Sequence, residues 1–398
     1  MTTIDRPPVR RGSNLPRVGD FNETVVLDAV RRATGGLSRV ELAASTRLSA
    51  QTVSNICRRL IARGLLVETG KRSGTGGKPR VVLEVEPGSR YAVGVHLDPA
   101  AITYVVLDLA GTVVERLRRP TPAVVDQDAT LEEMSLAVEA VLRSSGVPRD
   151  RVVGVGIAAP GPIDHTEGSV VDPPQLEGWH RVPVRDHVAR TTGLPVVMDK
   201  DVVAAVVGER WAGVASGSTD LVFFYLGTGA GMGIVAGDLV VRGGSGNAGE
   251  IGGLDASCTT RAVVEEAIER GVLAPEVTPV GPRDAERRLA EVATLAGSGD
   301  EVATDVIDGW ARRVGHGVGT AASLLDSDLI VFGGPMWPHL RDRFLAVVPP
   351  ILDSWPYPAL RRARLASSAL GDDVGAIGAA CLVLDQLLSP QPHTLLLS

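Results

Sequence analysis

Residues 226–235 read Leu-Gly-Thr-Gly-Ala-Gly-Met-Gly-Ile-Val, with a glycine at every second position from 227 to 233. The apolar run 221–226 leads into these glycines, and Ile234 and Val235 follow them. This pattern predicts a strand, a glycine turn and a second strand. Residues 326–335, Asp-Ser-Asp-Leu-Ile-Val-Phe-Gly-Gly-Pro, predict a strand that ends in a glycine pair. Glycines let a backbone approach a phosphate or a base closely, although such turns also serve as tight hairpins.

Outward from this stretch, apolar runs alternate with amphipathic segments. Strands are predicted at 91–97, 102–109, 152–158, 194–198 and 221–226, and helices at 131–144, 184–192 and 202–212. Strands that alternate with helices indicate an α/β protein. Residues 86–88, Glu-Pro-Gly, precede the first of these strands and predict a short hinge.

A different pattern precedes the hinge. Residues 1–20 are rich in Pro, Arg and Gly without a helical period, which predicts a flexible basic arm. A helix is expected over 21–34, and residues 38–41, Ser-Arg-Val-Glu, have the capping-box spacing that begins a short second helix. Ser49 then caps a third helix over 50–63, apolar on one face and polar on the other. This is the helix-turn-helix plan, whose last helix enters the major groove of DNA.

Two predicted strands, 65–69 and 81–85, flank a loop rich in Gly, Lys and Arg at 70–80. They predict the β-hairpin wing that completes a winged helix-turn-helix domain over 21–86. Contacts to DNA are expected from the polar face of the third helix and from the wing. The expected contact residues are Ser49, Gln51, Thr52, Ser54, Asn55, Arg58, Arg59, Lys71, Arg72, Lys78 and Arg80. A small helical docking domain is the alternative, but it explains neither the wing nor the charge.

The charge is divided unevenly along the chain. The 398 residues include 40 basic and 47 acidic side chains, a formal net charge of −7. Residues 1–80 hold fifteen basic and six acidic side chains, a net charge of +9, and the remainder carries −16. A basic segment on an acidic body is typical of a nucleic-acid-binding head.

Composition limits the class of protein further. Hydrophobic residues make up 44% and charged residues 22%, as in water-soluble globular proteins of two or three domains. No apolar run reaches about 18 residues, so a membrane span is not expected. The basic start lacks the apolar core of a signal peptide. Cys57, Cys258 and Cys381 lie far apart, which argues against a disulfide framework or a cysteine-rich zinc site. We expect a cytoplasmic protein.

Five segments form a specific set. They are 156–161 (Gly-Ile-Ala-Ala-Pro-Gly), 226–234, 246–252 (Gly-Asn-Ala-Gly-Glu-Ile-Gly), 330–334 (Ile-Val-Phe-Gly-Gly) and 375–380 (Gly-Ala-Ile-Gly-Ala-Ala). Together they resemble the ROK family (repressors, open reading frames and sugar kinases), and the resemblance covers residues 22–390. It implies a two-lobed α/β body of the actin-like, hexokinase-like fold, with lobes at 90–200 and 201–398 and a C-terminal helix over 373–388 that returns to the first lobe. It also implies a ligand cleft between the lobes and a homodimer or homotetramer.

The first phosphate loop of the family is altered. Its kinases carry D-x-G-G-T after the first strand, where this chain has His96-Leu-Asp-Pro-Ala100. Pro99 has no N–H to donate, and Asp98 repels a phosphate at 4 Å by about 1 kcal/mol in water and by more in a cleft. We therefore expect no ATP at this loop. His96 is expected to be a packed side chain, with a ligand contact as the alternative.

The resemblance also places candidate ligand residues. Asp201 occupies the position of the catalytic base, and Lys200 replaces the asparagine that holds a sugar hydroxyl. We expect Lys200 to lower the pKa of Asp201 and either to bind an anionic ligand or to pair with an acid, with a surface lysine as the alternative. Glu250 and Glu265 stand at the family's sugar-contacting carboxylates, and Glu266 is the rival of Glu265.

The zinc motif of the family is lost. Gly253 replaces its histidine, and Cys258 alone remains of its cysteines, which is too few for a structural zinc ion. We expect no metal and no other cofactor. The glycine turns persist as vestigial nucleotide-binding elements. Their residues are Gly227, Thr228, Gly229, Gly231, Gly333 and Gly334.

These features favour a DNA-binding transcriptional regulator, a repressor, rather than an enzyme. Its degenerate kinase-like body would sense a small molecule such as a sugar or a sugar derivative, and its partners would be operator DNA and that effector. Two alternatives stay open: an active ROK sugar kinase that uses ATP and also binds DNA, and a DNA-binding dimer without an effector.

Overall fold

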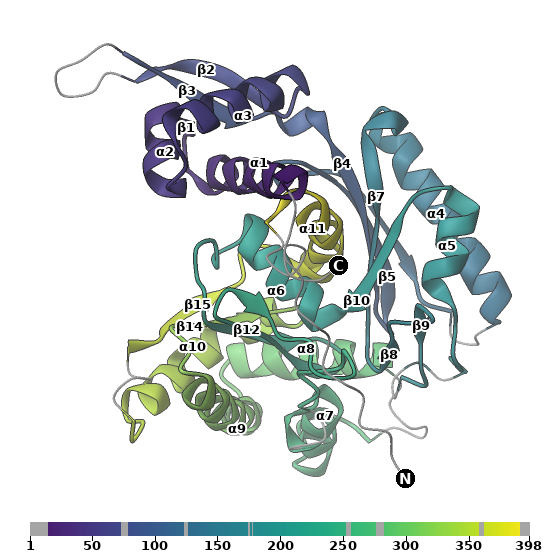
Figure 1. Cartoon of the computed structure of the whole chain (residues 1–398). Helices are drawn as coiled ribbons and strands as arrows, with labels where there is room; N and C mark the ends of the chain where they lie inside the picture. Colours follow the sequence, from purple (N-terminus) through teal and green to yellow (C-terminus); the bar gives the residue numbers. More distant parts are fainter. Residues whose placement is uncertain are drawn as a thin grey trace, which may run out of the picture. The chain divides into compact units, whose positions relative to one another are not determined.

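The chain divides into two compact units, Met1–Arg90 with Leu384–Ser398, and Tyr91–Val383. The computed structural model describes residues 15–72, 79–122, 126–173, 176, 178–251, 256–275, 282–357 and 362–390. Each unit has its own layers of helix and sheet (Figure 1).

The first unit is a helical bundle on a small antiparallel sheet. Its elements are α1 (Leu15–Arg32), β1 (Leu37–Ser38), α2 (Arg39–Thr46), α3 (Ala50–Ala62), β2 (Leu66–Arg72), β3 (Arg80–Val85) and the 3-10 turn η1 (Pro87–Ser89). The strands lie in the order β1-β3-β2. Apolar side chains of all three helices, such as Val26, Leu42 and Ile56, are buried with Leu83 of β3. The expected helix-turn-helix with its two-stranded wing is therefore confirmed.

The first helix begins earlier than expected. It starts at Leu15, so the prediction of an arm through residue 20 is wrong for 15–20, and residues 1–14 lie outside the described part of the chain. The proline at position 16 was the reason that no helix was predicted for these residues. It lies in the first turn, where a missing N–H removes no helical hydrogen bond.

The second unit contains two five-stranded sheets. The first has the order β10-β7-β4-β5-β6, in which β10, β7 and β4 are parallel. Its strands are β4 (Tyr91–Leu97), β5 (Ala101–Asp108), β6 (Val113–Pro120), β7 (Val152–Ala159) and β10 (Val196–Lys200). The helices α4 (Gln127–Ser145) and α5 (Val184–Thr192) cover one face and share an apolar core with it (Figure 1). The short elements η2 (Arg149–Arg151), β8 (Ile163–Asp164) and β9 (Ser169–Val170) complete this part.

The strand β6 was missed in the sequence. Half of its residues, Val-Val-Glu-Arg-Leu-Arg-Arg-Pro, are charged, because β6 is an edge strand whose side chains are exposed or half-buried. Only a weak alternation of exposure marks it as a strand.

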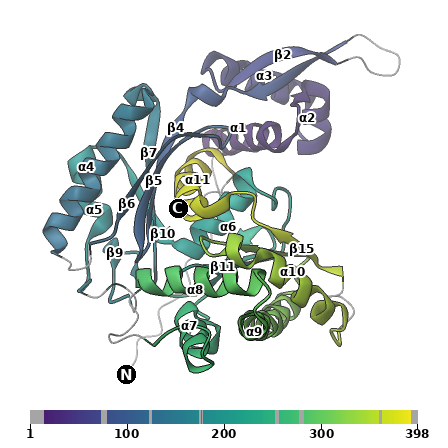
Figure 2. The ribbon, with the colours of Figure 1, turned by 180° about the vertical axis from the view of Figure 1, so that it is seen from behind.

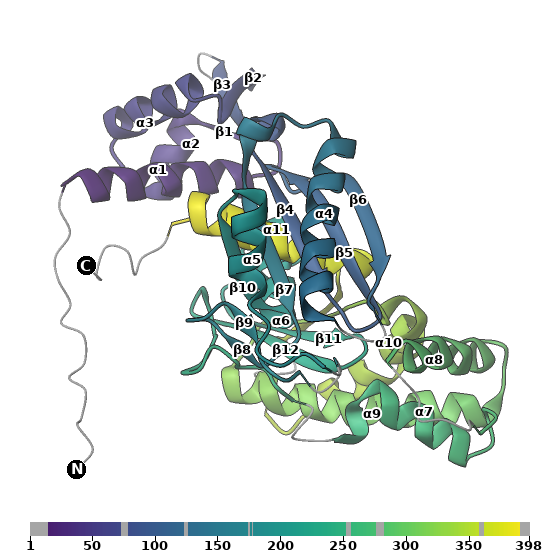
Figure 3. The same ribbon diagram turned by 90° about the vertical axis from the view of Figure 1, so that its right-hand side faces the viewer.

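The second sheet has the order β13-β12-β11-β14-β15. Its strands are β11 (Leu221–Leu226), β12 (Ala230–Ala236), β13 (Leu239–Val240), β14 (Leu329–Gly333) and β15 (Arg364–Ser367). One face carries η3 (Ala256–Cys258), α7 (Thr260–Glu269), α8 (Pro282–Gly297), α9 (Glu301–Leu325) and α10 (Trp337–Asp353). Figures 2 and 3 show these helices gathered on that side. Trp310, Phe332, Trp337 and Phe344 form the aromatic centre of the core. The glycine hairpin predicted at 226–235 is the β11–β12 turn.

The helix α6 (Asp201–Ala212) lies against strands of both sheets, and α11 (Val374–Leu388) packs closely on β4, β7 and α6. A Cβ atom on Gly156 of β7 would lie 1.7 Å from the carbonyl oxygen of Ala379, and one on Gly378 would lie 2.1 Å from that of Ala204. Glycine at these positions lets α11 approach β7 and α6 closely. Residues 374–383 thus return to the first sheet, after the turn η5 (Gly371–Asp373). Within the described ranges, no helix has the length and apolar character that crossing a membrane requires.

Candidate functional site

The third helix of the first unit carries an exposed polar row. Ser49 is its N-cap, and its side chain accepts a hydrogen bond from the Thr52 amide at 3.1 Å. The Gln51 amide donates to Asn55 Oδ1 at 3.2 Å, and Arg58 donates to the same oxygen. Gln51 and Arg58 are exposed, as a helix that reads base edges requires, and Thr52 and Asn55 are half-buried. Ser54, half-buried, lies beside this row.

Arg59 lies apart from this row. It pairs with Glu23 of α1, which also pairs with Arg63 at 2.9 Å. Its exposed guanidinium is therefore held by an acid within the domain, and it is a weaker candidate for a base contact than Gln51 or Arg58.

The wing is a twisted antiparallel pair. Lys71 lies opposite Val81 and Arg72 opposite Arg80, after an irregularity between Glu68 and Gly70. Lys71 and Arg80 are exposed. Lys78 and the side chain of Arg72 lie outside the described residues.

A cavity of about 370 Å³ lies in the second unit. It is formed where β4, β7 and β10 reach their carboxyl ends, opposite the β11–β12 turn, and parallel α/β sheets bind ligands at this edge. Its lining residues are Asp98, Pro99, Pro160, Gly161, Lys200, Asp201, Val202, Tyr225, Thr228, Gly229, Ala230, Gly231, Gly249, Glu250 and Thr259. The structure thus brings Lys200, Asp201 and Glu250 together, as the sequence predicted.

Lys200 is buried and fully bonded. It is 1% exposed, and its ammonium lies 2.6 Å from Glu250 Oε1. It also donates to the carbonyl oxygens of Ala248 at 3.1 Å and Asn247 at 3.4 Å. Of the expected roles, pairing with an acid is the one observed, and a surface lysine is ruled out. Three partners match the three N–H groups of an ammonium.

Asp201 begins α6 behind this pair. Burial raises its pKa to about 7, and the opposing effect of Lys200 is smaller. Lys200 does lower the pKa of Asp201, as expected, but the loss of solvation outweighs its charge, so the net shift is upward. One carboxylate oxygen accepts a hydrogen bond from the Val202 amide at 2.7 Å.

An acidic pair lies at the altered phosphate loop, with Asp98 in the loop and Glu286 on α8. The Thr228 hydroxyl lies 2.8 Å from Glu286 Oε1 and 3.4 Å from Asp98 Oδ1, and the Ala100 amide donates to Asp98 at 2.8 Å. Burial raises the pKa of Asp98. Burial and then the charge of Asp98 raise the pKa of Glu286 to about 7. Two acids around one hydroxyl therefore face the place where the family's kinases cradle phosphate.

The glycine turns have divided roles. Thr228, Gly229 and Gly231 line the cavity. Gly227 instead accepts a hydrogen bond from the Thr260 hydroxyl at 2.6 Å through its carbonyl oxygen. Gly333 and Gly334 are absent from the lining, and a Cβ on Gly334 would lie 2.3 Å from the Leu226 carbonyl oxygen. The glycine pair at the end of β14 thus serves the packing of the sheet.

His96 is a packed side chain, as expected. It is 3% exposed and lies edge-on to Tyr225. A Cβ on Gly375 would meet its ring, and burial lowers its pKa to about 4, so the imidazole is neutral at pH 7.

The structure keeps Glu265 out of the cavity. It lies on α7, half-exposed, and pairs with Arg261 at 2.8 Å. Glu266 pairs with Arg313 and Arg270 instead. The expectation of a ligand contact from either carboxylate is not met, because α7 turns both away from the lining.

Of the altered zinc motif, the structure describes Cys258 but not Gly253. The Cys258 carbonyl accepts a hydrogen bond from the Trp310 indole at 3.0 Å, whereas Gly253 lies outside the described residues. The sequence did not reveal Tyr225 and Thr259, which line the cavity, or Glu286, which contacts Thr228 of the lining, since no local motif marks them.

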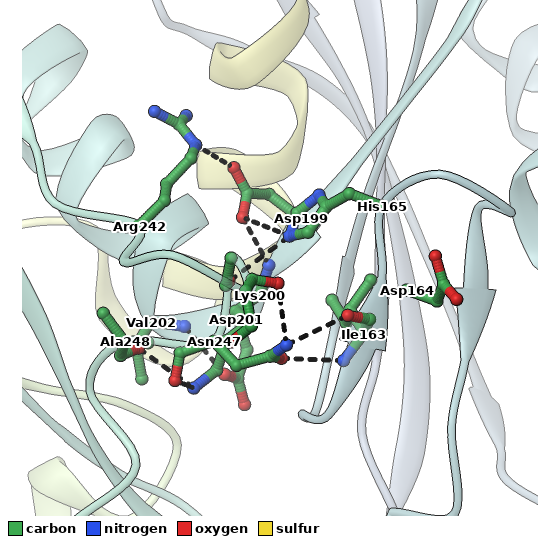
Figure 4. Close-up of polar contacts among 12 residues, drawn as sticks. Ile163, Asp164, His165, Asp199, Lys200, Asp201, Val202, Arg242, Asn247 and Ala248 are labelled. Carbon is green, nitrogen blue, oxygen red and sulfur yellow. Dashed lines mark hydrogen bonds and ion pairs between the residues drawn. The ribbon is translucent and has the colours of Figure 1, made fainter. Parts of the chain in front are cut away.

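A connecting segment, residues 242–250, links the two sheets beside the cavity (Figure 4). It follows β13 of the second sheet and contacts residues of the first. The Asn247 side chain accepts from the Ile163 amide at 2.8 Å and donates to the Ile163 carbonyl at 3.0 Å. Arg242 donates to buried Asp199 at 2.7 Å, and His165 lies 3.9 Å from the same carboxylate.

Comparison with known proteins agrees with this arrangement. The ROK family profile matches residues 92–386, and the MarR family profile matches residues 19–77. A xylose repressor of Caldicellulosiruptor bescii is 25% identical and covers 89% of this chain and 93% of its own length. A glucokinase of Halalkalibacterium halodurans is 27% identical and covers 75% and 96%. The crystal structure of a ROK family transcriptional regulator, a homologue of the Escherichia coli MLC protein, has a TM-score of 0.74 at 20% identity and covers 95% and 98%. This protein belongs to the ROK family and carries an N-terminal winged helix of the MarR type.

Proposed function

We propose that this protein is a transcriptional repressor that binds operator DNA through its first unit and senses a sugar or sugar derivative in the cavity of its second unit. The observation that carries the proposal is the presence in one chain of the polar row Gln51, Asn55 and Arg58 and of a ROK body in which Asp98 and Glu286 meet at the altered phosphate loop. The xylose repressor, which matches the chain over nearly its whole length, supports it.

The proposed mechanism is linkage between ligand and DNA. A ligand that binds more tightly when the cavity is closed shifts the population toward that state. The segment 242–250 is suited to such a change, because its contacts with Ile163, Asp199 and Lys200 join the two sheets. In a dimer, a change of lobe closure would alter the spacing of two heads, and half-sites accept recognition helices only about one helical turn apart.

Sugar phosphorylation is the second candidate function. Asp201 favours it, because a carboxyl with a pKa near 7 beside a cavity suits a general base. The acids at the phosphate loop oppose it. A coupled assay with Mg-ATP and a panel of sugars separates the two, and turnover that disappears in Asp201→Asn would establish the kinase.

Selection of bound fragments from genomic DNA tests the regulator directly. We expect a small set of fragments that share a two-fold related motif, bound in a gel shift at fixed salt and released by one class of small molecule. Enrichment of no motif would refute operator binding. A shared motif whose binding no small molecule changes would favour a dimer without an effector.

A further inference from the structure

The cavity offers little to an anion. Among the described residues that line it, Lys200 is the one basic side chain, and Asp98, Asp201 and Glu250 are acids. The ammonium of Lys200 already meets Glu250, Ala248 and Asn247, and it is 1% exposed. A phosphate or carboxylate would have to detach it from Glu250 to gain a cationic partner, leaving a carboxylate without its charge partner.

The far wall adds a second obstacle. Asp98 and Glu286 share the hydroxyl of Thr228, which lines the cavity. Pro99, beside them, has no N–H to donate. In this loop the Ala100 amide already donates to Asp98, and a phosphate group would be repelled by whichever of the two acids is ionised.

The same groups suit an uncharged polar ligand. Carboxylates accept hydrogen bonds, and a polyhydroxylated compound supplies donors in several directions. The bond from Lys200 holds Glu250, which is half-exposed, at the rim as such an acceptor.

We propose that Asp98, Glu286 and the Lys200–Glu250 pair make the cavity selective for unphosphorylated polyhydroxy ligands and exclude their phosphate esters. This inference rests on the proposed sensing function and defines the class of effector. Asp98 and Glu286 are the residues that discriminate against a phosphate group on the ligand. Lys200 positions Glu250.

The test compares matched ligand pairs on the full-length protein. Hexoses, pentoses and amino sugars are each titrated calorimetrically beside their phosphate esters, with glucose and glucose 6-phosphate, and N-acetylglucosamine and its 6-phosphate, as the first pairs. We expect the parent sugar that binds to do so at least about tenfold more tightly than its ester, a difference of about 1.4 kcal/mol. In Asp98→Asn and in Glu286→Gln, the ratio should narrow by at least about threefold, which is about 0.65 kcal/mol. Asp150→Asn, an exposed acid in η2, is the control and should keep the wild-type ratio.

Each outcome is decisive. An ester that binds as tightly as its parent, or a ratio that neither variant changes, overturns the inference and leaves the sensing function intact. If no sugar and no ester binds while the operator is still bound, both the sensing function and the inference fail. Glu286→Gln carries the comparison if Asp98→Asn does not fold.

Discussion

The ammonium of Lys200 lies 2.6 Å from Glu250 Oε1, a contact that joins the end of β10 to the segment after β13. The two residues stand fifty positions apart and meet at the wall of the cavity. A neutral side chain in this position could not replace the lysine, because the ammonium also donates hydrogen bonds to two backbone carbonyl groups of the same segment.

Replacing Lys200 by Met should lower the free energy of unfolding by about 1–3 kcal/mol. The carbonyls of Asn247 and Ala248 lose their donor, while Glu250 keeps part of its solvation because 53% of its side chain is exposed. Urea denaturation measures the loss. Lys71→Met, at an exposed position of β2, is the matched control and should change stability by less than about 0.5 kcal/mol. Equal stability of both variants would mean that the contacts of the Lys200 ammonium contribute nothing to stability.

The raised pKa of Asp201 predicts a pH-dependent stability. An aspartate has a pKa near 4 in an unfolded chain and about 7 here, so between these values the folded protein binds more protons. This contribution to the free energy of unfolding therefore falls as pH rises from about 4 to about 7. Asp201→Asn removes it, so the variant should gain stability relative to wild type between pH 5 and pH 8. Lys200, Glu250 and Asp98 face the group in both proteins.

Urea midpoints at pH 5, 6, 7 and 8 test this difference. His96 acts in the opposite direction, because its lowered pKa makes protonation favour the unfolded chain, but it is common to wild type and variant. Parallel curves for the two proteins would refute the assignment to Asp201.

The elements that sequence reasoning found carry local signals. The capping box of Ser38 and Glu41 and the glycine run at 226–235 determine backbone geometry within a few residues, and both occur where expected. Local signals do not give the side chains that reach the cavity from distant positions, such as Thr259. They also do not give burial, which decided the sign of the pKa shift at Asp201. The predicted ligand contact of Glu265 was not found for a similar reason, because the orientation of α7 depends on packing far from the motif.

Asn247 should contribute to stability through its two bonds to the backbone of Ile163. In Asn247→Ala both backbone groups lose their partner, and we expect a loss of about 1–3 kcal/mol in the free energy of unfolding. Asn247→Asp keeps an acceptor for the Ile163 amide but sets a carboxylate oxygen against the Ile163 carbonyl oxygen, so it should not restore the stability of wild type. Urea denaturation at pH 7 ranks the three proteins, and an alanine variant as stable as wild type would exclude a clamping role for Asn247.

Replacement of glycine by alanine should have opposite effects on stability at two positions, Gly156 and Gly317. Alanine at Gly156 would place its Cβ 1.7 Å from the Ala379 carbonyl oxygen, so α11 must move away from β7 and the protein should lose about 3 kcal/mol or more. Gly317 lies inside α9, and beyond its chain neighbours and the backbone of that helix no atom lies within 4 Å of a Cβ built there. Alanine there should stabilise the protein by about 0.5–1 kcal/mol, because it narrows the unfolded ensemble and favours the helix. Thermal unfolding of both variants tests whether α11 packs on the first sheet as closely as described.

Alanine substitutions in α3 should weaken DNA binding to different extents. Gln51 and Arg58 belong to the exposed row of α3 and are free to exchange their contacts with Asn55 for base edges. Each alanine variant should lose about 1–3 kcal/mol of binding to the selected operator fragment and discriminate less against altered sites. Arg59 is held by Glu23, so Arg59→Ala should weaken binding less and by a similar factor for all sequences. Gel shifts at one salt concentration, with operator and scrambled DNA, measure both effects. A loss of specificity in Arg59→Ala that exceeds the loss in Gln51→Ala and Arg58→Ala would assign base recognition to a different face of the helix.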